Sequence, residues 1–213
     1  MKLIARILKG SSLHSMMPNI LTVGRILLTP IFIICLFYDA PWARPAALLV
    51  FIVASVTDAW DGYIARKRNL VTKAGAFLDP LADKILVSSA FISFAIMGKV
   101  PYWMAALIIF RDMFVTGLRM LFLSRGISLV TSKIAKFKTV TQVAGVLLVL
   151  SYLAMKKLSL LATDTITSAV DSLHLIYYAL LAVTLFTAYT GLSYLFINRQ
   201  TIWEFISTPH QTP

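Results

Sequence analysis

Charged residues are scarce in this sequence, and their scarcity excludes an ordinary soluble domain. Only 14% of the 213 residues are charged and 59% are hydrophobic, whereas soluble domains carry about 25% charged residues. Cysteine is nearly absent: Cys35 is alone, so no disulfide can form within the chain. The sequence also lacks internal repeats and low-complexity stretches. Because the apolar residues fall in long runs, we expect an all-α, polytopic membrane protein.

Six apolar runs are long enough, or nearly so, to cross a bilayer as helices, which takes roughly 17–25 residues. They are Ile20–Phe37, Ala46–Ile64, Phe77–Met97, Tyr102–Leu123, Val140–Met155 and Leu175–Ile197. Residues 1–17 combine apolar and basic positions at helical spacing, which predicts an amphipathic helix lying at the membrane interface. We therefore predict an interfacial helix at 1–17, a domain of six transmembrane helices at 18–200 and a cytoplasmic tail at 201–213.

Basic residues are distributed unequally between the two sides of the predicted helices. If the N-terminus is cytoplasmic, twelve basic residues fall in inside segments and only four in outside loops. The positive-inside rule then predicts that both termini are cytoplasmic. The net charge of +11 suits a protein that faces anionic lipids. Binding to nucleic acid is not expected, because the sequence has no basic arm and no zinc-ligand spacing.

Four further basic residues lie inside the predicted helices: Arg25, Lys84, Arg111 and Arg119. A charge in the hydrocarbon region is costly, so such residues usually face a polar cavity or a partner. With the predicted topology, three of the four fall in the cytoplasmic half of the membrane. We therefore expect a shared polar cavity that opens toward the cytoplasm.

Four of the nine acidic residues fall within one short stretch, as Asp58, Asp61, Asp79 and Asp83. Asp58 and Asp61 are three residues apart, and Asp79 and Asp83 are four apart. The members of each pair therefore share one face of a helix. Four carboxylates held together repel one another unless cations compensate, and Mg²⁺ or Mn²⁺ suits such oxygen ligands. Two ions about 3.5–4 Å apart would suit displacement at phosphorus. Helix capping, or pairing with the basic loop between the helices, explains one aspartate well but four with this spacing poorly.

The stretch that contains these aspartates resembles the signature of the CDP-alcohol phosphotransferase family at every signature position. It is Asp58-Ala-Trp-Asp61-Gly62-Tyr-Ile-Ala65-Arg66, then eight residues, then Gly75-Ala-Phe-Leu-Asp79-Pro-Leu-Ala-Asp83. The family's six-helix organisation fits the whole chain. The resemblance implies transfer of the phosphatidyl group of CDP-diacylglycerol to an alcohol with release of CMP, by a homodimer in a bacterial inner membrane.

The resemblance also implies roles for individual residues. Asp58, Asp61 and Asp79 are expected to be metal ligands, while Asp83 is expected both near the second metal ion and as the general base. That base would take a proton from the acceptor hydroxyl, which then attacks the β-phosphorus. The CDP-lipid is expected to contact a further set of residues: Gly62, Ala65, Arg66, Gly75 and, from the early run Pro18–Arg25, Asn19 and Thr22.

Basic residues of the fourth predicted helix and the loop after it indicate the acceptor. Arg111 and Arg119 are eight residues apart, about 80° around a helix, and Lys136 and Lys138 follow in the loop. Together they favour a phosphorylated acceptor over choline or ethanolamine. These blocks resemble family members that use sn-glycerol 3-phosphate and make phosphatidylglycerophosphate, which implies that the four residues hold its phosphate. The positive-inside rule is the plainer explanation of any one lysine.

Other acceptors and another class of protein remain open. Asp112 and Met120 stand where such members often have Glu, and Ala135 stands where they often have Gly. Family members that make cardiolipin from phosphatidylglycerol also have Arg-Asp and Ser-Lys here, and phosphatidylinositol phosphate synthases are a further alternative. A cation transporter is disfavoured, because the acidic residues gather at the predicted inner ends of helices whose outer halves are apolar.

Overall fold

The computed structural model describes residues 13–68, 73–130, 133–158 and 161–207, and within these ranges the chain forms helices and no strand. Side chains are not described for 13–23, 58–68, 73–83, 133–136, 161–163 and 206. The helices are α2 (Leu13–Phe37), α3 (Ala43–Arg68), α4 (Lys73–Ile96), α5 (Tyr102–Ser124), α6 (Lys133–Leu158), α7 (Leu161–Ser172), α8 (Leu175–Ile197) and α9 (Arg199–Ser207). The expected all-α fold is confirmed for the described residues.

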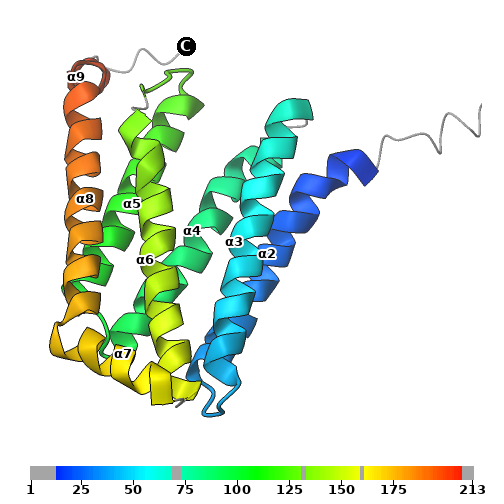
Figure 1. Ribbon diagram of the computed structural model, residues 1–213. Coiled ribbons are helices and arrows are strands. Elements are labelled where there is room, and N and C mark those ends of the chain that lie inside the picture. The colour runs from blue at the N-terminus through cyan, green and yellow to red at the C-terminus, as the bar shows by residue number, and fades with distance from the viewer. Residues whose placement is uncertain (1–12, 69–72, 131–132, 159–160, 208–213) are drawn as a thin grey trace, which may run out of the picture.

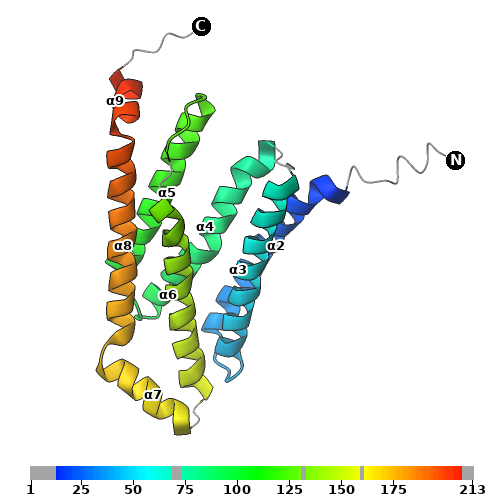
Figure 2. The same cartoon turned by 45° about the horizontal axis from the view of Figure 1, so that its top comes forward.

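The long helices form two groups that meet along α4 and α6. One group contains α2, α3 and α4, and the other contains α5, α6 and α8 (Figure 1). Contacts of α3 and α4 with α6, and of α4 with α5, join the groups. Short α7 lies across one end of the molecule, below α6 and α8, in both views (Figure 2). The C-terminal end of α3, the N-terminal end of α4, the end of α5 and α9 lie at the opposite end.

Each of the six predicted apolar runs coincides with a helix: five lie wholly within one, and Phe77–Met97 ends one residue after α4. The run Leu175–Ile197 has the same bounds as α8. Most of the other helices extend beyond the apolar run that they contain. Helix α6, for example, begins at Lys133, seven residues before Val140. Backbone hydrogen bonding continues through polar residues that a hydropathy pattern does not count. Two helices, α7 and α9, were not predicted. Residues 1–12 lie outside the description, so the interfacial helix at 1–17 stays a prediction.

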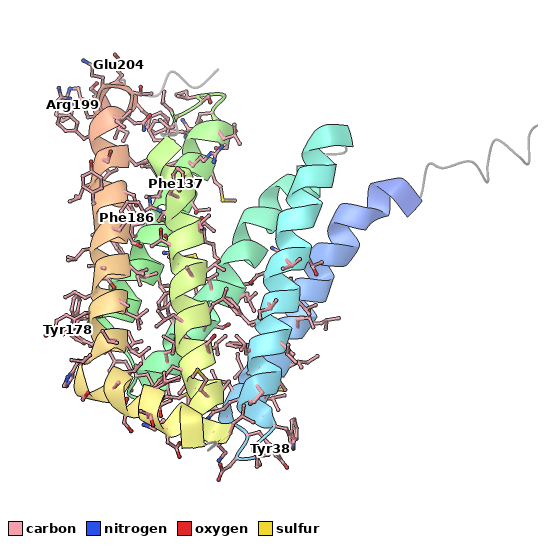
Figure 3. All side chains as sticks on the ribbon, viewed as in Figure 1. Tyr38, Phe137, Tyr178, Phe186, Arg199 and Glu204 are labelled. Carbon is pink, nitrogen blue, oxygen red and sulfur yellow. The ribbon has the colours of Figure 1, made fainter. Side chains whose placement is uncertain are left out.

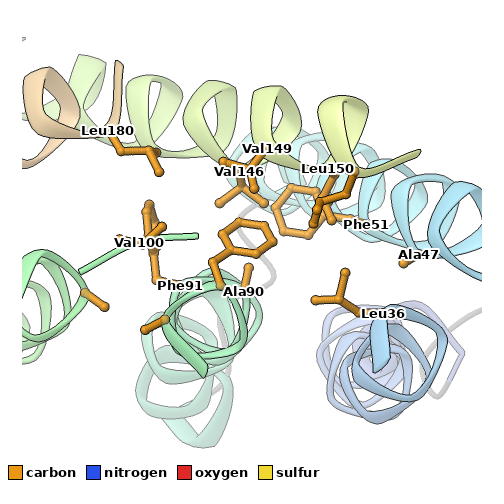
Figure 4. Close-up of a cluster of buried hydrophobic side chains, with 14 of the residues drawn as sticks. Leu36, Ala47, Phe51, Ala90, Phe91, Val100, Val146, Val149, Leu150 and Leu180 are labelled. Atoms are coloured by element: carbon orange, nitrogen blue, oxygen red, sulfur yellow. The ribbon is translucent and has the colours of Figure 1, made fainter. Parts of the chain in front are cut away.

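The buried core lies where the two groups of helices meet. Phe51 of α3 and Phe91 of α4 are both inaccessible to solvent and pack close to Val146, Val149 and Leu150 of α6 (Figure 4). Buried alanines separate the large side chains: Ala47, Ala54, Ala90 and Ala95. Small residues at helix contacts let the backbones approach, which matters in a membrane because packing, not water exclusion, holds the helices together.

Large apolar side chains also point outward on the long helices. Leu49, Phe110, Val140 and Leu192, on four different helices, are all more than 60% exposed. Among the described residues, Phe137–Leu158 and Leu175–Ile197 are helical segments long and apolar enough to span a membrane. Shorter apolar helical segments occur at Gly24–Phe37, Ala43–Thr57 and Lys84–Ile96.

Polar contacts anchor α7 at its end of the bundle. Asp171 accepts hydrogen bonds from Tyr152 Oη at 2.5 Å and from Lys156 Nζ at 2.7 Å. The bond from Lys156, followed by that from Tyr152, holds the pKa of Asp171 below its usual value. Figure 3 places Tyr38 and Tyr178 toward this end and Arg199 and Glu204 at the other.

Candidate active site

The four predicted metal-binding aspartates belong to the facing ends of two consecutive helices. Asp58 and Asp61 lie in the last three turns of α3, and Asp79 and Asp83 lie in the first three turns of α4. Only residues 69–72 separate these helices, and Figure 1 shows both ends on the side of the α5–α6 connection. The backbone therefore brings the two pairs to one end of the bundle.

The side chains of these aspartates lie outside the described residues, so their role as ligands stays a prediction. The same holds for the predicted CDP-lipid contacts and for one acceptor residue: Asn19, Thr22, Gly62, Ala65, Arg66, Gly75 and Lys136. Among the side chains that are described, no three of His, Cys, Asp or Glu gather closely enough to hold a metal ion. The described part of the chain thus offers no rival to the aspartates as a metal site.

A buried cluster of charges joins three helices in the described part of the structure. At its centre is Asp112 of α5, whose Oδ1 accepts hydrogen bonds from Lys138 Nζ of α6 and from Arg111 Nη1 at 3.2 Å. Lys84 Nζ of α4 lies 3.8 Å from Asp112 Oδ2. The side chain of Lys138 is 2% exposed and that of Asp112 is 6% exposed. We call these four residues the Asp112 cluster.

The Asp112 cluster contains three basic side chains and one carboxylate. A buried charge must be paired or it is strongly destabilising, because desolvation costs several kcal/mol per ion. Asp112 compensates only one of its three cationic neighbours. In addition, Arg111 Nε is buried and has no hydrogen-bond partner among the described residues. The arrangement is therefore suited to receive an anion that carries more than one negative charge.

Helix α8 borders this cluster and leaves space for Arg111. A Cβ atom built on Gly191 would lie 2.9 Å from Arg111 Cγ and 3.2 Å from its Nε. Real Cβ atoms essentially never come within 3.0 Å of such an atom, so only glycine fits here without moving the arginine. The position of Arg111 therefore depends on a residue 80 positions later in the chain.

Asn198 fixes the segment that leads into α6 and its lysines. Its Oδ1 accepts a hydrogen bond from Val130 N at 2.9 Å, and its Nδ2 donates to Val130 O at 3.1 Å. The amide also donates to Tyr194 O at 2.9 Å. Both backbone groups of Val130 are thus paired with one side chain at the end of α8. This contact fixes the position of Val130, which precedes α6 and its residue Lys138 in the chain.

The structure brings together only some of the predicted acceptor-binding residues. Arg111 and Lys138 lie in the Asp112 cluster, whereas Arg119 is exposed and makes no ion pair with a described residue. Lys84 and Asp112 belong to the cluster but were not predicted as site residues. From the sequence alone, Asp112 is interpreted only as a departure from Glu. A single carboxylate beside Arg111 in an apolar helix could have indicated a site residue, because charges inside such helices usually face a partner.

Comparison with protein families matches residues 15–187 to the CDP-alcohol phosphatidyltransferase family. The chain belongs to this family. The match covers α2 to α6, α7 and most of α8, and so includes both pairs of aspartates and the whole Asp112 cluster. The family predicted from the motif between Asp58 and Asp83 is thereby confirmed.

Curated relatives within the CDP-alcohol phosphatidyltransferase family have closely related names. CDP-diacylglycerol–glycerol-3-phosphate 3-phosphatidyltransferase of Bacillus subtilis (strain 168) is 42% identical over 61% of this chain and 74% of its own length. The protein of that name from Rickettsia bellii (strain RML369-C) is 37% identical over 84% of this chain and 92% of its own. A probable phosphatidylglycerophosphate synthase of Mycobacterium tuberculosis (strain ATCC 25618 / H37Rv) is 39% identical over 60% of this chain, which spans only 62% of that protein.

Proposed function

We propose that this protein transfers the phosphatidyl group of CDP-diacylglycerol to sn-glycerol 3-phosphate, giving phosphatidylglycerophosphate and CMP. Its family supports the reaction class, and the names of its relatives in Bacillus subtilis and Rickettsia bellii support the acceptor. The observation in the structure that carries the choice of acceptor is the Asp112 cluster, in which three basic side chains surround one carboxylate.

The charge of the cluster favours a phosphate monoester over a diester. The second pKa of a phosphate monoester is about 6, so the group carries close to two negative charges at pH 7. The phosphate of phosphatidylglycerol is a diester and carries one. Three basic side chains around the single carboxylate of Asp112 match a dianion better than a monoanion. This match favours glycerol 3-phosphate over the acceptor used in cardiolipin synthesis.

The aspartates of α3 and α4 supply the chemistry in this proposal. Asp83 accepts the proton of the acceptor hydroxyl, whose oxygen forms a bond to the β-phosphorus of the CDP-lipid. The bond from that phosphorus to the bridging oxygen breaks, and CMP leaves with the electron pair. Asp58, Asp61 and Asp79, together with Asp83, would hold two Mg²⁺ or Mn²⁺ ions, whose charge stabilises the attacking and leaving oxygens. Their four carboxylates are the oxygen donors that these ions prefer.

The nucleotide would be held beside these carboxylates by residues of α2, α3 and α4. Arg66 suits the phosphate oxygens, because its guanidinium can bind two of them at once. Gly62 and Gly75 let phosphate or nucleotide approach the backbone. Ala65, Asn19 and Thr22 complete the proposed contacts with the CDP-lipid.

We further propose six membrane spans in a bacterial inner membrane, with both termini and the active site on the cytoplasmic side. The two long apolar segments and the outward-facing apolar side chains support a membrane location. The excess of basic residues in the predicted inside segments supports the orientation. The proposed organisation keeps the interfacial helix at 1–17, the six-helix domain at 18–200 and the tail at 201–213. A homodimer is proposed from the family resemblance alone.

The test is release of CMP by the purified protein in detergent, with CDP-diacylglycerol and Mg²⁺. Glycerol 3-phosphate, phosphatidylglycerol, inositol phosphate and no acceptor are compared. Release that depends on glycerol 3-phosphate is expected. Release only with another alcohol would overturn the acceptor and keep the reaction class. No release with any acceptor, from folded protein, would overturn both, and cation flux into liposomes without CDP-lipid would then support the transporter.

A further inference from the structure

Helix α8 presents a buried polar face toward α5 and α6. Its buried polar side chains include Thr184, Thr187, Thr190 and Tyr194. The three threonines are satisfied: Thr184 donates to Leu180 O at 2.7 Å, Thr190 donates to Thr187 O at 2.8 Å, and Thr187 Oγ1 accepts from Gln142 at 3.4 Å. Tyr194 is different, because its ring is packed while its hydroxyl is not used.

The Tyr194 hydroxyl is buried and has no hydrogen-bond partner within the described part of the chain. The residue as a whole is 4% exposed, and its ring packs in a cluster with Phe122 and Leu129. A buried polar group left without a partner costs about 1–3 kcal/mol. A phenylalanine would fill the same space without that cost. The presence of the hydroxyl therefore indicates a hydrogen-bond partner outside the described chain.

The second unsatisfied atom lies in the same part of the molecule. Arg111 Nε is the only other buried side-chain nitrogen or oxygen without a partner among the described residues. Gly191, which contacts the Arg111 side chain, precedes Tyr194 by three residues, so both lie on one face of α8. Two groups that can donate hydrogen bonds thus lack partners, one in the Asp112 cluster and one on the face of α8 that Arg111 contacts.

We propose that Tyr194 is an acceptor-binding residue, whose hydroxyl donates a hydrogen bond to the phosphate of the acceptor while Arg111 Nε donates a second. This inference rests on the proposed function, which supplies the phosphate monoester. It extends the site to α8, beyond residue 187, where the match to the family ends. Arg111 links the two parts, because it contacts both Asp112 and the backbone position of Gly191.

The test is Tyr194→Phe, which removes only the hydroxyl. Hydrogen bonds to charged groups contribute about 1.5–3 kcal/mol, so the KM for glycerol 3-phosphate should rise roughly 10- to 100-fold. The KM for CDP-diacylglycerol should stay within about twofold. The midpoint of thermal unfolding without substrate should stay the same or rise, because a partnerless hydroxyl has been removed. Tyr189→Phe is the matched control, since Tyr189 lies on the same helix and is 58% exposed.

An unchanged KM for glycerol 3-phosphate in Tyr194→Phe would overturn the inference. It would indicate that a buried water, and not the acceptor, is the hydrogen-bond partner of the hydroxyl. Failure of the proposed function is detected separately, in the wild-type protein, as transfer only to another alcohol. In that case inhibition of the observed transfer by inorganic phosphate is the readout. Weaker inhibition of Tyr194→Phe than of wild type would support the phosphate contact, and equal inhibition would overturn it.

Discussion

Gly191 of α8 lies so close to Arg111 of α5 that a Cβ at position 191 would come within 2.9 Å of Arg111 Cγ. Arg111 in turn donates to Asp112, which anchors Lys138 and Lys84. The absence of a side chain at Gly191 of α8 thereby leaves the space in which the Arg111 side chain of α5 lies. The consequence can be measured, because a single methyl group should displace the arginine.

Gly191→Ala should raise the KM for glycerol 3-phosphate several-fold, because Arg111 must adopt another rotamer. Overpacking costs about 1–3 kcal/mol, whereas alanine gains about 1 kcal/mol in helix propensity over glycine. The free energy of unfolding should therefore fall by no more than about 2 kcal/mol. Gly117→Ala in α5 is the control, because nothing would lie within 4 Å of its Cβ. A wild-type KM in Gly191→Ala would show that the position of Arg111 does not matter for the acceptor.

Asp112→Asn should destabilise the protein strongly, because Lys138 and Arg111 lose their buried counter-ion. Removing one partner of a buried pair typically costs about 3–5 kcal/mol. Denaturant unfolding in detergent measures this loss. Combining Asp112→Asn with Lys138→Met should recover part of it, since fewer cations then lack an anion. Asp164→Asn, at an exposed position in the first turn of α7, should lower the free energy of unfolding by no more than about 1 kcal/mol. Equal stability of Asp112→Asn and wild type would contradict the proposed role as counter-ion.

Asn198→Ala should lower the free energy of unfolding by about 1–3 kcal/mol, because both backbone groups of Val130 lose their partner. The KM for glycerol 3-phosphate should also rise, since Val130 leads into the segment that carries Lys138. Gln200→Ala, at an exposed position of α9, serves as the control. If stability falls while the KM is unchanged, Asn198 holds the fold without positioning the lysine.

Asp58→Asn and Asp79→Asn should each abolish transfer to every acceptor, because the proposed metal site loses a charged ligand. CMP release is measured beside gel filtration in detergent, which reports whether the variants fold. Asp39→Asn is the matched control. That exposed aspartate lies between α2 and α3, before the end of α3 opposite the motif, and pairs with Lys157 of α6. Near-normal turnover in either motif variant would remove the metal assignment.

Lys136→Ala should raise the KM for glycerol 3-phosphate more than that for CDP-diacylglycerol. The reason is electrostatic, since the lysine is proposed to bind the acceptor phosphate and not the nucleotide. Lys99→Ala, in the connection before α5, removes a positive charge at the other end of the molecule and should affect neither KM. Equal effects of Lys136→Ala on both substrates would argue against a dedicated acceptor pocket.

Local patterns in the sequence predicted those features that depend on one segment at a time. The bounds of α8 follow from the run Leu175–Ile197, and the family follows from residue types between Asp58 and Asp83. Helices α7 and α9 were missed because they are short and mostly polar, so no apolar run marks them. The predictions therefore succeeded where hydropathy or a dense motif carries the information.

Relations between distant segments were not predictable from those patterns. The sequence predicted that Arg111, Arg119 and Lys138 share a site. Helix packing instead brings Lys84, which was not predicted, together with Arg111 and Lys138 around Asp112, and leaves Arg119 exposed. The need for glycine at 191 arises only because α5 packs against α8. Such a requirement is created by tertiary contact, and no local pattern around Gly191 records it.

The contacts of α8 also restrict how its length can change. Gly191, Tyr194 and Asn198 are three and four residues apart, so they follow one face of the helix over two turns. Inserting or deleting one residue between Gly191 and Asn198 would turn one of them about 100° away from this face. The gap beside Arg111 and the contact with Val130 could then not both form. Natural length variation in this protein should therefore avoid this stretch of α8 and occur in its connections.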